Sequence, residues 1–178
     1  MRLWVQAVRR LNRPPSIESV VERLAYWKSY SGTLDAAYYL YIFYSILALD
    51  GSRVAVDEAR RYIEECRQLA RFRRKRTLSF EWLGTGSGLS RLVHYSELGE
   101  FIQGEFWSSP ERLARVRGKI ARIDEPQAGY IEMDGGLNTF FVPGRAGYSR
   151  SFSENRSVEF YLGFSYDGLR AWQVRDAQ

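Results

Sequence analysis

The chain has 178 residues, of which 45% are hydrophobic and 26% are charged, a composition typical of globular proteins and not of disordered ones. A chain of this length can bury roughly 70% of its extended surface, so we expect one or two domains with a real core. No apolar run is long and charge-free enough to span a bilayer, so an integral membrane protein is not expected.

The residue types that carry redox and metal chemistry are almost absent. One cysteine excludes an internal disulfide framework, and one cysteine with one histidine removes most metal sites, so we predict no metal and no cofactor. Arg9 and Arg10 stand where a secretory signal needs its apolar centre, which favours a cytoplasmic protein. The net charge is +5, and the excess lies before residue 111, because residues 111–178 carry ten basic and nine acidic side chains.

Residues 1–70 have the pattern of a helical region. An amphipathic stretch over residues 3–11 stops at two prolines, and Ser16 then has the features of an N-cap for a second helix that ends near Tyr30. The aromatic run of residues 36–49 predicts a third helix that is apolar nearly all round. Apolar residues at three- and four-residue spacing over residues 56–70 predict a fourth helix, and the pair resembles a tetratricopeptide-like hairpin in architecture only.

Residues 71–110 form a connecting or wrapping segment, for which short helices and an ordered wrapping path both stay open. It begins with the basic cluster of residues 71–76. The glycine-rich run of residues 84–88 lacks the Gly-Lys-Ser/Thr ending of a phosphate-binding loop, so it indicates a simple loop.

Residues 111–178 have strand character. Five short segments, at 116–123, 129–133, 139–142, 157–164 and 169–174, are separated by turn residues. Five strands over about sixty residues favour a small barrel of the oligonucleotide/oligosaccharide-binding (OB) type over a sandwich. The predicted fold class is therefore α+β, with tetratricopeptide-like helical hairpins followed by a five-stranded OB-type barrel.

Short motifs in residues 116–175 resemble cold-shock domains in order and spacing. They are GKI at 118–120, AGYI at 128–131, DGG at 134–136, FFV at 140–142, VEF at 158–160 and GLRA at 168–171. Cold-shock domains bind single-stranded RNA or DNA by stacking bases on aromatic side chains of two motifs, on the second and third strands. The resemblance implies the same kind of ligand for this barrel.

The resemblance transfers only part of the stacking platform. Tyr130 and Phe141 match aromatic positions of the two motifs, whereas Ala128 replaces an aromatic residue, Pro143 a histidine and Arg122 the first-strand tryptophan. Weak binding is therefore expected, with help from basic residues. The candidate nucleic-acid-binding residues are Tyr130, Phe141, Arg122, Lys119, Arg73, Arg74 and Arg76.

The whole chain also resembles the C-terminal region of large bacterial regulators in which a signalling NTPase of the STAND class, or another effector domain, precedes helical repeats. The phrases that carry this likeness are SFEWLGTGSGL, RLVHYSELGEF and VEFYLGFSYDGLRAW. A start directly inside an apolar helix would also fit a fragment of a longer chain. The resemblance implies a protein-interaction, sensor or capping module, with upstream helical repeats or another protein as the partner.

No arrangement of residues predicts an enzyme. His94 lies between Val93 and Tyr95 and has the pattern of a partly buried structural residue, and Cys66 falls in the apolar stripe of the fourth helix, where a thiol behaves as a small hydrophobic group. The sequence therefore favours a non-enzymatic module that binds single-stranded nucleic acid weakly and without sequence preference. The interaction or capping module is the alternative.

Overall fold

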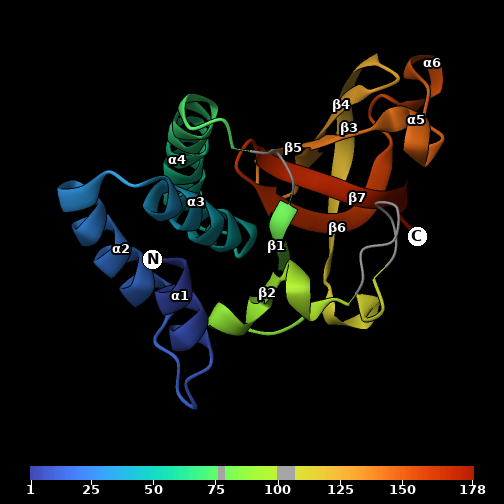
Figure 1. Ribbon diagram of the computed structural model, residues 1–178. Coiled ribbons are helices and arrows are strands. Elements are labelled where there is room, and N and C mark those ends of the chain that lie inside the picture. Colours follow the sequence, from blue (N-terminus) through green and yellow to red (C-terminus); the bar gives the residue numbers. More distant parts are fainter. Residues whose placement is uncertain (76–78, 100–106) are drawn as a thin grey trace.

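The computed structural model describes residues 1–75, 79–99 and 107–178, and its helices precede most of its strands (Figure 1). The N-terminal helices are α1 (Arg2–Arg9), α2 (Ile17–Ser31), α3 (Leu34–Leu49) and α4 (Arg53–Phe72). The remaining elements are β1 (Ser79–Leu83), β2 (Leu92–His94), β3 (Arg115–Glu125), β4 (Ala128–Met133), β5 (Asn138–Phe141), α5 (Pro143–Ala146), α6 (Arg150–Ser153), β6 (Ser157–Ser165) and β7 (Gly168–Asp176). Single turns of 3₁₀-helix lie at residues 88–91, 95–97 and 110–112. The predicted α+β order is confirmed.

Local sequence explains where the helices begin and end. The Ser16 hydroxyl accepts a hydrogen bond from the Ser19 N–H, as predicted for an N-cap, and Thr33 does the same for α3. Gly32 ends α2 in the left-handed conformation that glycine favours. None of the helices in the described part of the chain is long and apolar enough to cross a bilayer.

Strands β3 to β7 close into a five-stranded barrel, as predicted. Its strand order is β3-β4-β5-β7-β6, and β6 pairs again with β3, which closes the ring. All pairs are antiparallel except β5 with β7, which are parallel and meet at Phe140 and Arg170. Apolar side chains of both the barrel and the helices belong to one continuous hydrophobic cluster.

The segment between helices and barrel contains two strands that the sequence analysis left unassigned. The pairing of β6 with β3 stops at Tyr161, and β1 pairs with the following residues 163–165 of β6. β2 then pairs with β1. β1 has only five residues, and its pairing depends on a partner more than seventy residues later in the chain. Local pattern therefore could not reveal it. Trp82 and Trp107 of this segment pack near Tyr161 and Trp172 of the barrel strands, so the segment covers the outside of β6 and β7.

Helix α3 joins the two halves of the molecule. Twelve of its sixteen residues are buried, because α2 and α4 cover one side and the barrel with β1 covers the other. Its tyrosines carry polar hydroxyls into this core, where each needs a hydrogen-bond acceptor. Tyr38 donates to the Phe164 carbonyl oxygen at 2.7 Å, Tyr41 donates to the Ser165 carbonyl oxygen, and Tyr39 donates to the Glu81 carboxyl group at 3.0 Å.

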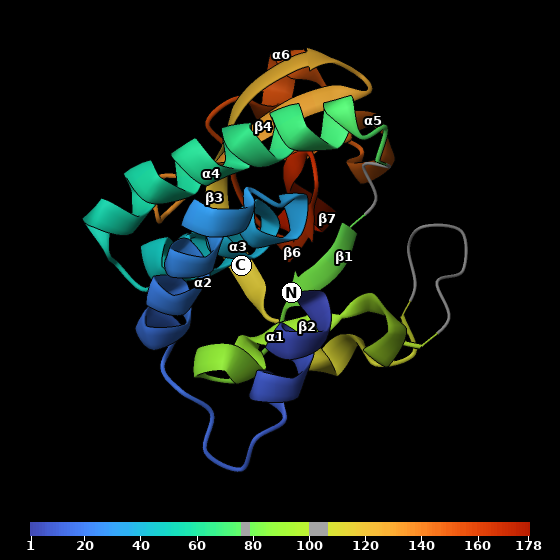
Figure 2. The same cartoon turned by 60° about the vertical axis from the view of Figure 1, so that its left-hand side comes forward.

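Helix α4 lies across the end of the barrel where two of its turns are found (Figure 2). Arg60 donates to the Gly136 carbonyl oxygen at 2.8 Å in the β4–β5 turn, and Arg67 donates to the Asp167 carbonyl oxygen at 2.5 Å in the β6–β7 turn. The helix therefore runs from one turn to the next. Its basic C-terminal end, after Arg67, extends past β7.

We expect Tyr38→Phe to lower the free energy of unfolding by about 1–3 kcal/mol, because it leaves the buried Phe164 carbonyl oxygen without its donor. Denaturant unfolding measures the change. Tyr30→Phe is the matched control, since Tyr30 is 78% exposed and its hydroxyl can be replaced by water. Equal stability of the two variants would contradict the role given to the Tyr38 hydroxyl.

Glu81 is a buried carboxyl group at the junction of α3 and β1. It is 1% exposed, and burial raises its pKa to about 7, although the hydrogen bond from Tyr39 and the charges of Arg2 and Arg9 act in the opposite direction. In the unfolded chain the same carboxyl group titrates near 4.5. The folded state therefore holds a proton on Glu81 that the unfolded state loses as the pH rises from about 4.5 to about 7.

The contribution of Glu81 to stability is full below about pH 4.5 and is lost as the pH rises toward 7. We expect Glu81→Gln to remove this loss, because the amide oxygen can still accept from Tyr39 and never ionises. The variant should gain up to about 3 kcal/mol on the wild type between pH 5 and pH 8, which denaturant unfolding at several pH values measures. A stability difference that does not change with pH would contradict the assignment.

Candidate nucleic-acid interface

Four side chains form a row across the outside of the barrel. Arg122 of β3 faces Tyr130 of β4, Tyr130 faces Phe140 of β5, and Phe140 faces Arg170 of β7 in the strand register. Partners in register lie on the same side of a sheet. We call Arg122, Tyr130, Phe140 and Arg170 the cross-strand row.

The spacing within the cross-strand row is that of stacked cationic and aromatic groups. The Arg122 guanidinium carbon lies 4.6 Å from the centre of the Tyr130 ring, and the Arg170 carbon lies 4.6 Å from the centre of the Phe140 ring. The two rings meet edge to face with their centres 5.9 Å apart. Both rings are partly exposed, so the row presents two aromatic surfaces with a positive charge at each end.

A β-bulge in β3 brings Arg122 into the row. The pairing of β3 with β4 shifts between Ile120 and Arg122, so Ala121 and Arg122 are both exposed while Ile120 and Ile123 are buried. Bulges re-aim side chains in this way. The Arg122 side chain is 61% exposed, and its Nε atom lies 3.1 Å from the Asp124 carboxylate.

Phe141 does not belong to this surface. The expectation that its ring faces solvent is wrong, because the side chain is 1% exposed and packs in the core. Successive side chains of a strand point to opposite faces, and Phe141 pairs with Gly129 on the inner face. A Cβ atom at Gly129 would lie 2.5 Å from the Phe141 ring, so the glycine makes room for it. The neighbouring Phe140 takes the outer position opposite Tyr130.

The remaining predicted residues have different positions. Lys119 is exposed on β3, three residues before Arg122, but faces the exposed carboxylate residue Glu132 across the strands. Arg73 and Arg74 are exposed at the C-terminal end of α4. Arg76 lies outside the described residues. The structure thus brings Arg122 and Tyr130 together, with Lys119 on the same strand, and places Arg73 and Arg74 on another element.

Asp167 connects the cross-strand row to helix α4. Arg170 lies 3.6 Å from the Asp167 carboxylate, and Arg67 of α4 donates to the carbonyl oxygen of the same residue. Arg71 follows Arg67 by one helical turn, so the basic end of α4 continues from the Arg170 end of the row over roughly 10 Å. Burial lowers the pKa of Arg170, but an arginine side chain keeps its charge at neutral pH.

Arg74 ends helix α4 in an unusual conformation. Its φ angle is +52°, and the following Lys75 N–H donates to the Ala70 carbonyl oxygen at 2.9 Å. This is the position at which helices usually carry glycine. A positively charged side chain therefore occupies a position at which glycine would cause no backbone strain.

Other candidate centres have structural partners. The His94 ring nitrogen Nδ1 lies 2.7 Å from the Ser96 hydroxyl and accepts from the Ser96 N–H, which caps a short helical turn, and burial lowers its pKa. Cys66 is fully buried, and burial raises its pKa above the ordinary range. In the short turn after the glycine-rich run, Arg91 forms an ion pair with Asp50. No group of three His, Cys, Asp or Glu residues that could hold a metal occurs in the described part of the chain.

Sequence reasoning missed Phe140 and Arg170. The signal was present, because Tyr130 and Phe140 flank a turn whose length determines which residues face each other. Alignment with the cold-shock motifs instead assigned the outward-facing position to Phe141. Arg170 joins the row through a parallel pairing between non-consecutive strands, which no local pattern reports.

Comparisons with models of protein families, with curated proteins and with solved structures found no match for this chain.

Proposed function

We propose that this protein is a non-enzymatic module that binds single-stranded nucleic acid weakly, with little sequence preference, along the cross-strand row of its barrel. The observation that supports the proposal is the row itself, in which two partly exposed rings lie between two guanidinium groups. Bases of any identity can stack on aromatic rings, and arginines attract the phosphates between them. The likeness to cold-shock domains, the cytoplasmic location and the bacterial origin stay predictions.

A base that stacks on the Tyr130 ring would gain more free energy than the Arg122 guanidinium that lies there now. An exposed cation–π contact, such as that of Arg122 on Tyr130, is worth about 0.5–1 kcal/mol. A base stacked on an aromatic side chain is worth about 1–3 kcal/mol. A base can therefore displace the Arg122 guanidinium from the ring, and the exposed side chain can then turn to a phosphate.

Two rings support only a weak site. They supply about 2–6 kcal/mol, which by itself corresponds to affinities no better than tens of micromolar. Lys119, Arg73 and Arg74 would add phosphate contacts, which depend on salt and not on sequence.

The test measures binding of a fluorescently labelled oligo(dT) of about 12 nucleotides, a length that fills one OB barrel. We expect Tyr130→Ala together with Phe140→Ala to weaken binding by about 5- to 150-fold for each ring that stacks a base. The matched control is Tyr26→Ala with Tyr30→Ala, which removes two exposed tyrosines from α2. Equal affinity of wild type and the Tyr130/Phe140 variant would disprove the proposal.

Salt dependence tests the contribution of the basic end of α4. Each phosphate contact to a single strand lowers log K by about 0.7 for each tenfold rise in salt. Arg74→Gly should reduce this slope by about 0.7 if Arg74 contacts a phosphate, and it should not destabilise the helix end, because glycine accepts the positive φ. An unchanged slope would restrict the interface to the barrel.

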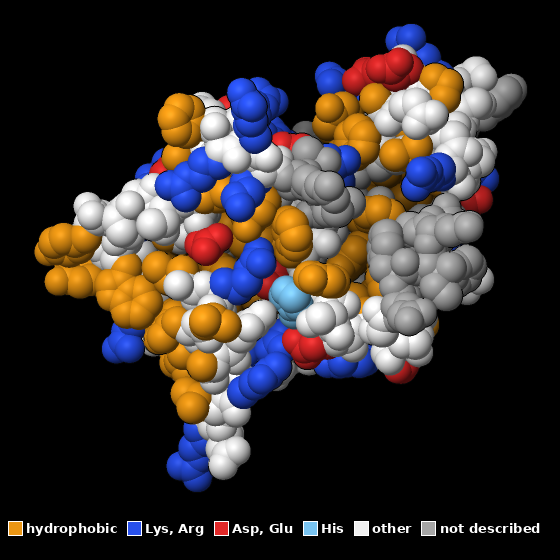
Figure 3. Space-filling model, viewed as in Figure 1, with side chains coloured by type: hydrophobic (Ala, Val, Ile, Leu, Met, Phe, Trp, Pro, Cys, Tyr) orange, Lys and Arg blue, Asp and Glu red, His pale blue; other side chains and the backbone are white. Residues whose placement is uncertain are grey.

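A second candidate function rests on a separate surface. Four of the large hydrophobic residues that are exposed in the described chain, Leu3, Leu11, Tyr26 and Tyr30, lie on or next to α1 and α2. Figure 3 shows hydrophobic side chains gathered over these two helices, on the left of the view. Because α2 packs on α3 and α3 packs on α4, the next layer of the same stack would be another helix. A helical repeat of a larger regulator is the partner that this surface fits.

A photo-crosslinking residue at position 30 tests this second function in cell extract, with one at the exposed position 150 as control. We expect position 30, and not position 150, to capture one helical-repeat protein, and Tyr26→Ser with Tyr30→Ser to reduce binding of a hydrophobic dye. No capture and unchanged dye binding would argue against the second function. Capture of a second copy of this chain would identify the surface as a self-association site.

A further inference from the structure

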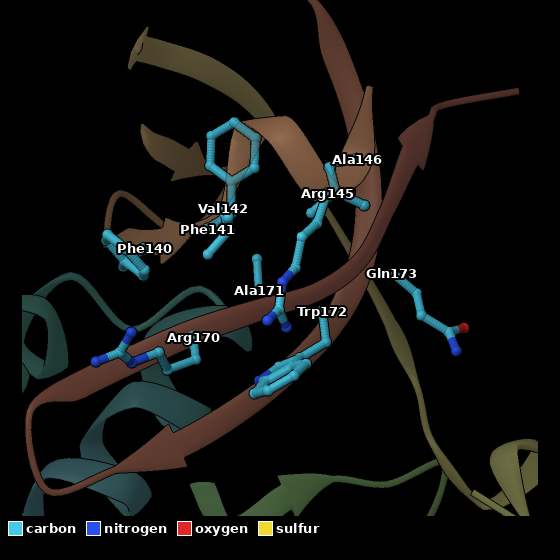
Figure 4. A pocket seen from close by; sticks show the side chains of 10 residues that line it. Phe140, Phe141, Val142, Arg145, Ala146, Arg170, Ala171, Trp172 and Gln173 are labelled. Atoms are coloured by element: carbon cyan, nitrogen blue, oxygen red, sulfur yellow. The ribbon is translucent and has the colours of Figure 1, made fainter. Parts of the chain in front are cut away.

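A pocket of about 400 Å³ lies at the Arg170 end of the cross-strand row, between β7 and the chain that leaves β5 (Figure 4). Its walls include Phe140, Val142, Arg145, Arg170, Trp172 and Val174. The volume is within the range of pockets that hold small ligands. Phe140 and Arg170 belong to both the cross-strand row and the pocket. One end of a ligand bound along the row can therefore enter the pocket.

The pocket exists because β5 and β7 separate. Among the described residues they pair at Phe140 and Arg170 alone, and β5 ends one residue later, at Phe141. Pro143 then starts α5 after Val142. On the other side, β7 has an irregular register with β6, and Gln173 has a φ angle of +47°. After Phe140 and Arg170 the two strands therefore diverge, although β7 stays paired with β6 as far as Asp176, and the pocket lies between them.

The residues that line the pocket favour a ligand with a flat ring and a negatively charged group. Its walls are aromatic and aliphatic apart from the arginines and Gln173, and the described lining residues include two arginines and no carboxylate. Figure 4 shows the Arg145 side chain reaching from α5 toward Ala171 and Trp172, while Gln173 points away. Arg170 is already held by Phe140 and Asp167, whereas no acidic side chain forms an ion pair with Arg145 among the described residues.

We infer that this pocket binds a phosphorylated terminal nucleotide of the single strand, with its base against Phe140 and Trp172 and its terminal phosphate at Arg145. The inference rests on the proposed function. A terminal phosphate carries about 1.5–2 negative charges at pH 7, compared with one for an internal phosphodiester. The Arg145 guanidinium, which has no acidic partner among the described residues, therefore favours the terminal group. The chemistry is that of a nucleoside monophosphate, whether it stands at the 5′ or the 3′ end.

The test compares oligo(dT) of about 12 nucleotides with a 5′-phosphate, with a 3′-phosphate and with neither. We expect one phosphorylated form to bind about tenfold more tightly than the form without a terminal phosphate. Arg145→Gln should abolish this difference and leave binding of the unphosphorylated strand unchanged. Arg150→Gln is the matched control, since Arg150 is an exposed arginine on α6 outside the pocket.

The outcomes separate this inference from the proposed function. If the unphosphorylated strand binds and a terminal phosphate at either end adds nothing, the inference fails and the proposed function stands. A phosphate effect that persists in Arg145→Gln would also overturn the inference. If no oligonucleotide binds, the proposed function fails, and binding of thymidine monophosphate that is lost in Arg145→Gln would still support the pocket as a nucleotide site.

Discussion

Helix α3 can be buried on nearly every side only because its tyrosine hydroxyls find acceptors on the barrel and on β1. A hydroxyl in an apolar core without a partner costs about 1–3 kcal/mol, and α3 brings three of them into the junction. Two hydroxyls bind carbonyl oxygens at the end of β6, and one binds the Glu81 carboxyl group. The positions of these acceptors set where the helix lies on the barrel.

That attachment determines how the rest of the helical region is placed. Because α4 packs on α3, its arginines reach the β4–β5 and β6–β7 turns, where Arg60 and Arg67 bind backbone carbonyl oxygens. The same placement directs the basic end of α4 toward the side of the barrel that carries Arg170. The α4 residue Arg67 thereby reaches Asp167, the ion-pair partner of Arg170 at the end of the cross-strand row, although Arg67 and Asp167 are a hundred residues apart in the chain.

The two surfaces that we propose as binding sites differ in chemistry. In the cross-strand row a guanidinium group lies over each of two partly exposed rings, where we propose that bases stack in its place. The pocket beyond it is enclosed by two separating strands and holds an arginine without an acidic partner in the described part of the chain. An open row suits the repeated units of a strand, whereas a pocket suits one unit with an additional charge. The exposed helical surface over α1 and α2 is separate from both.

The sequence by itself determined most of the secondary structure and the class of the fold. Local sequence patterns indicated the helix cap at Ser16, the apolar helix and the five strand segments, because these depend on neighbours within a few residues. The resemblance to cold-shock domains also pointed to Tyr130 and Arg122, which the structure places side by side. Matching the motifs chose Phe141 over Phe140 as the outward-facing ring, because it did not use the register of β4 with β5 that the turn length determines. Only the tertiary structure brought in Arg170, the pocket and β1, since each depends on pairing between strands that are distant in the chain.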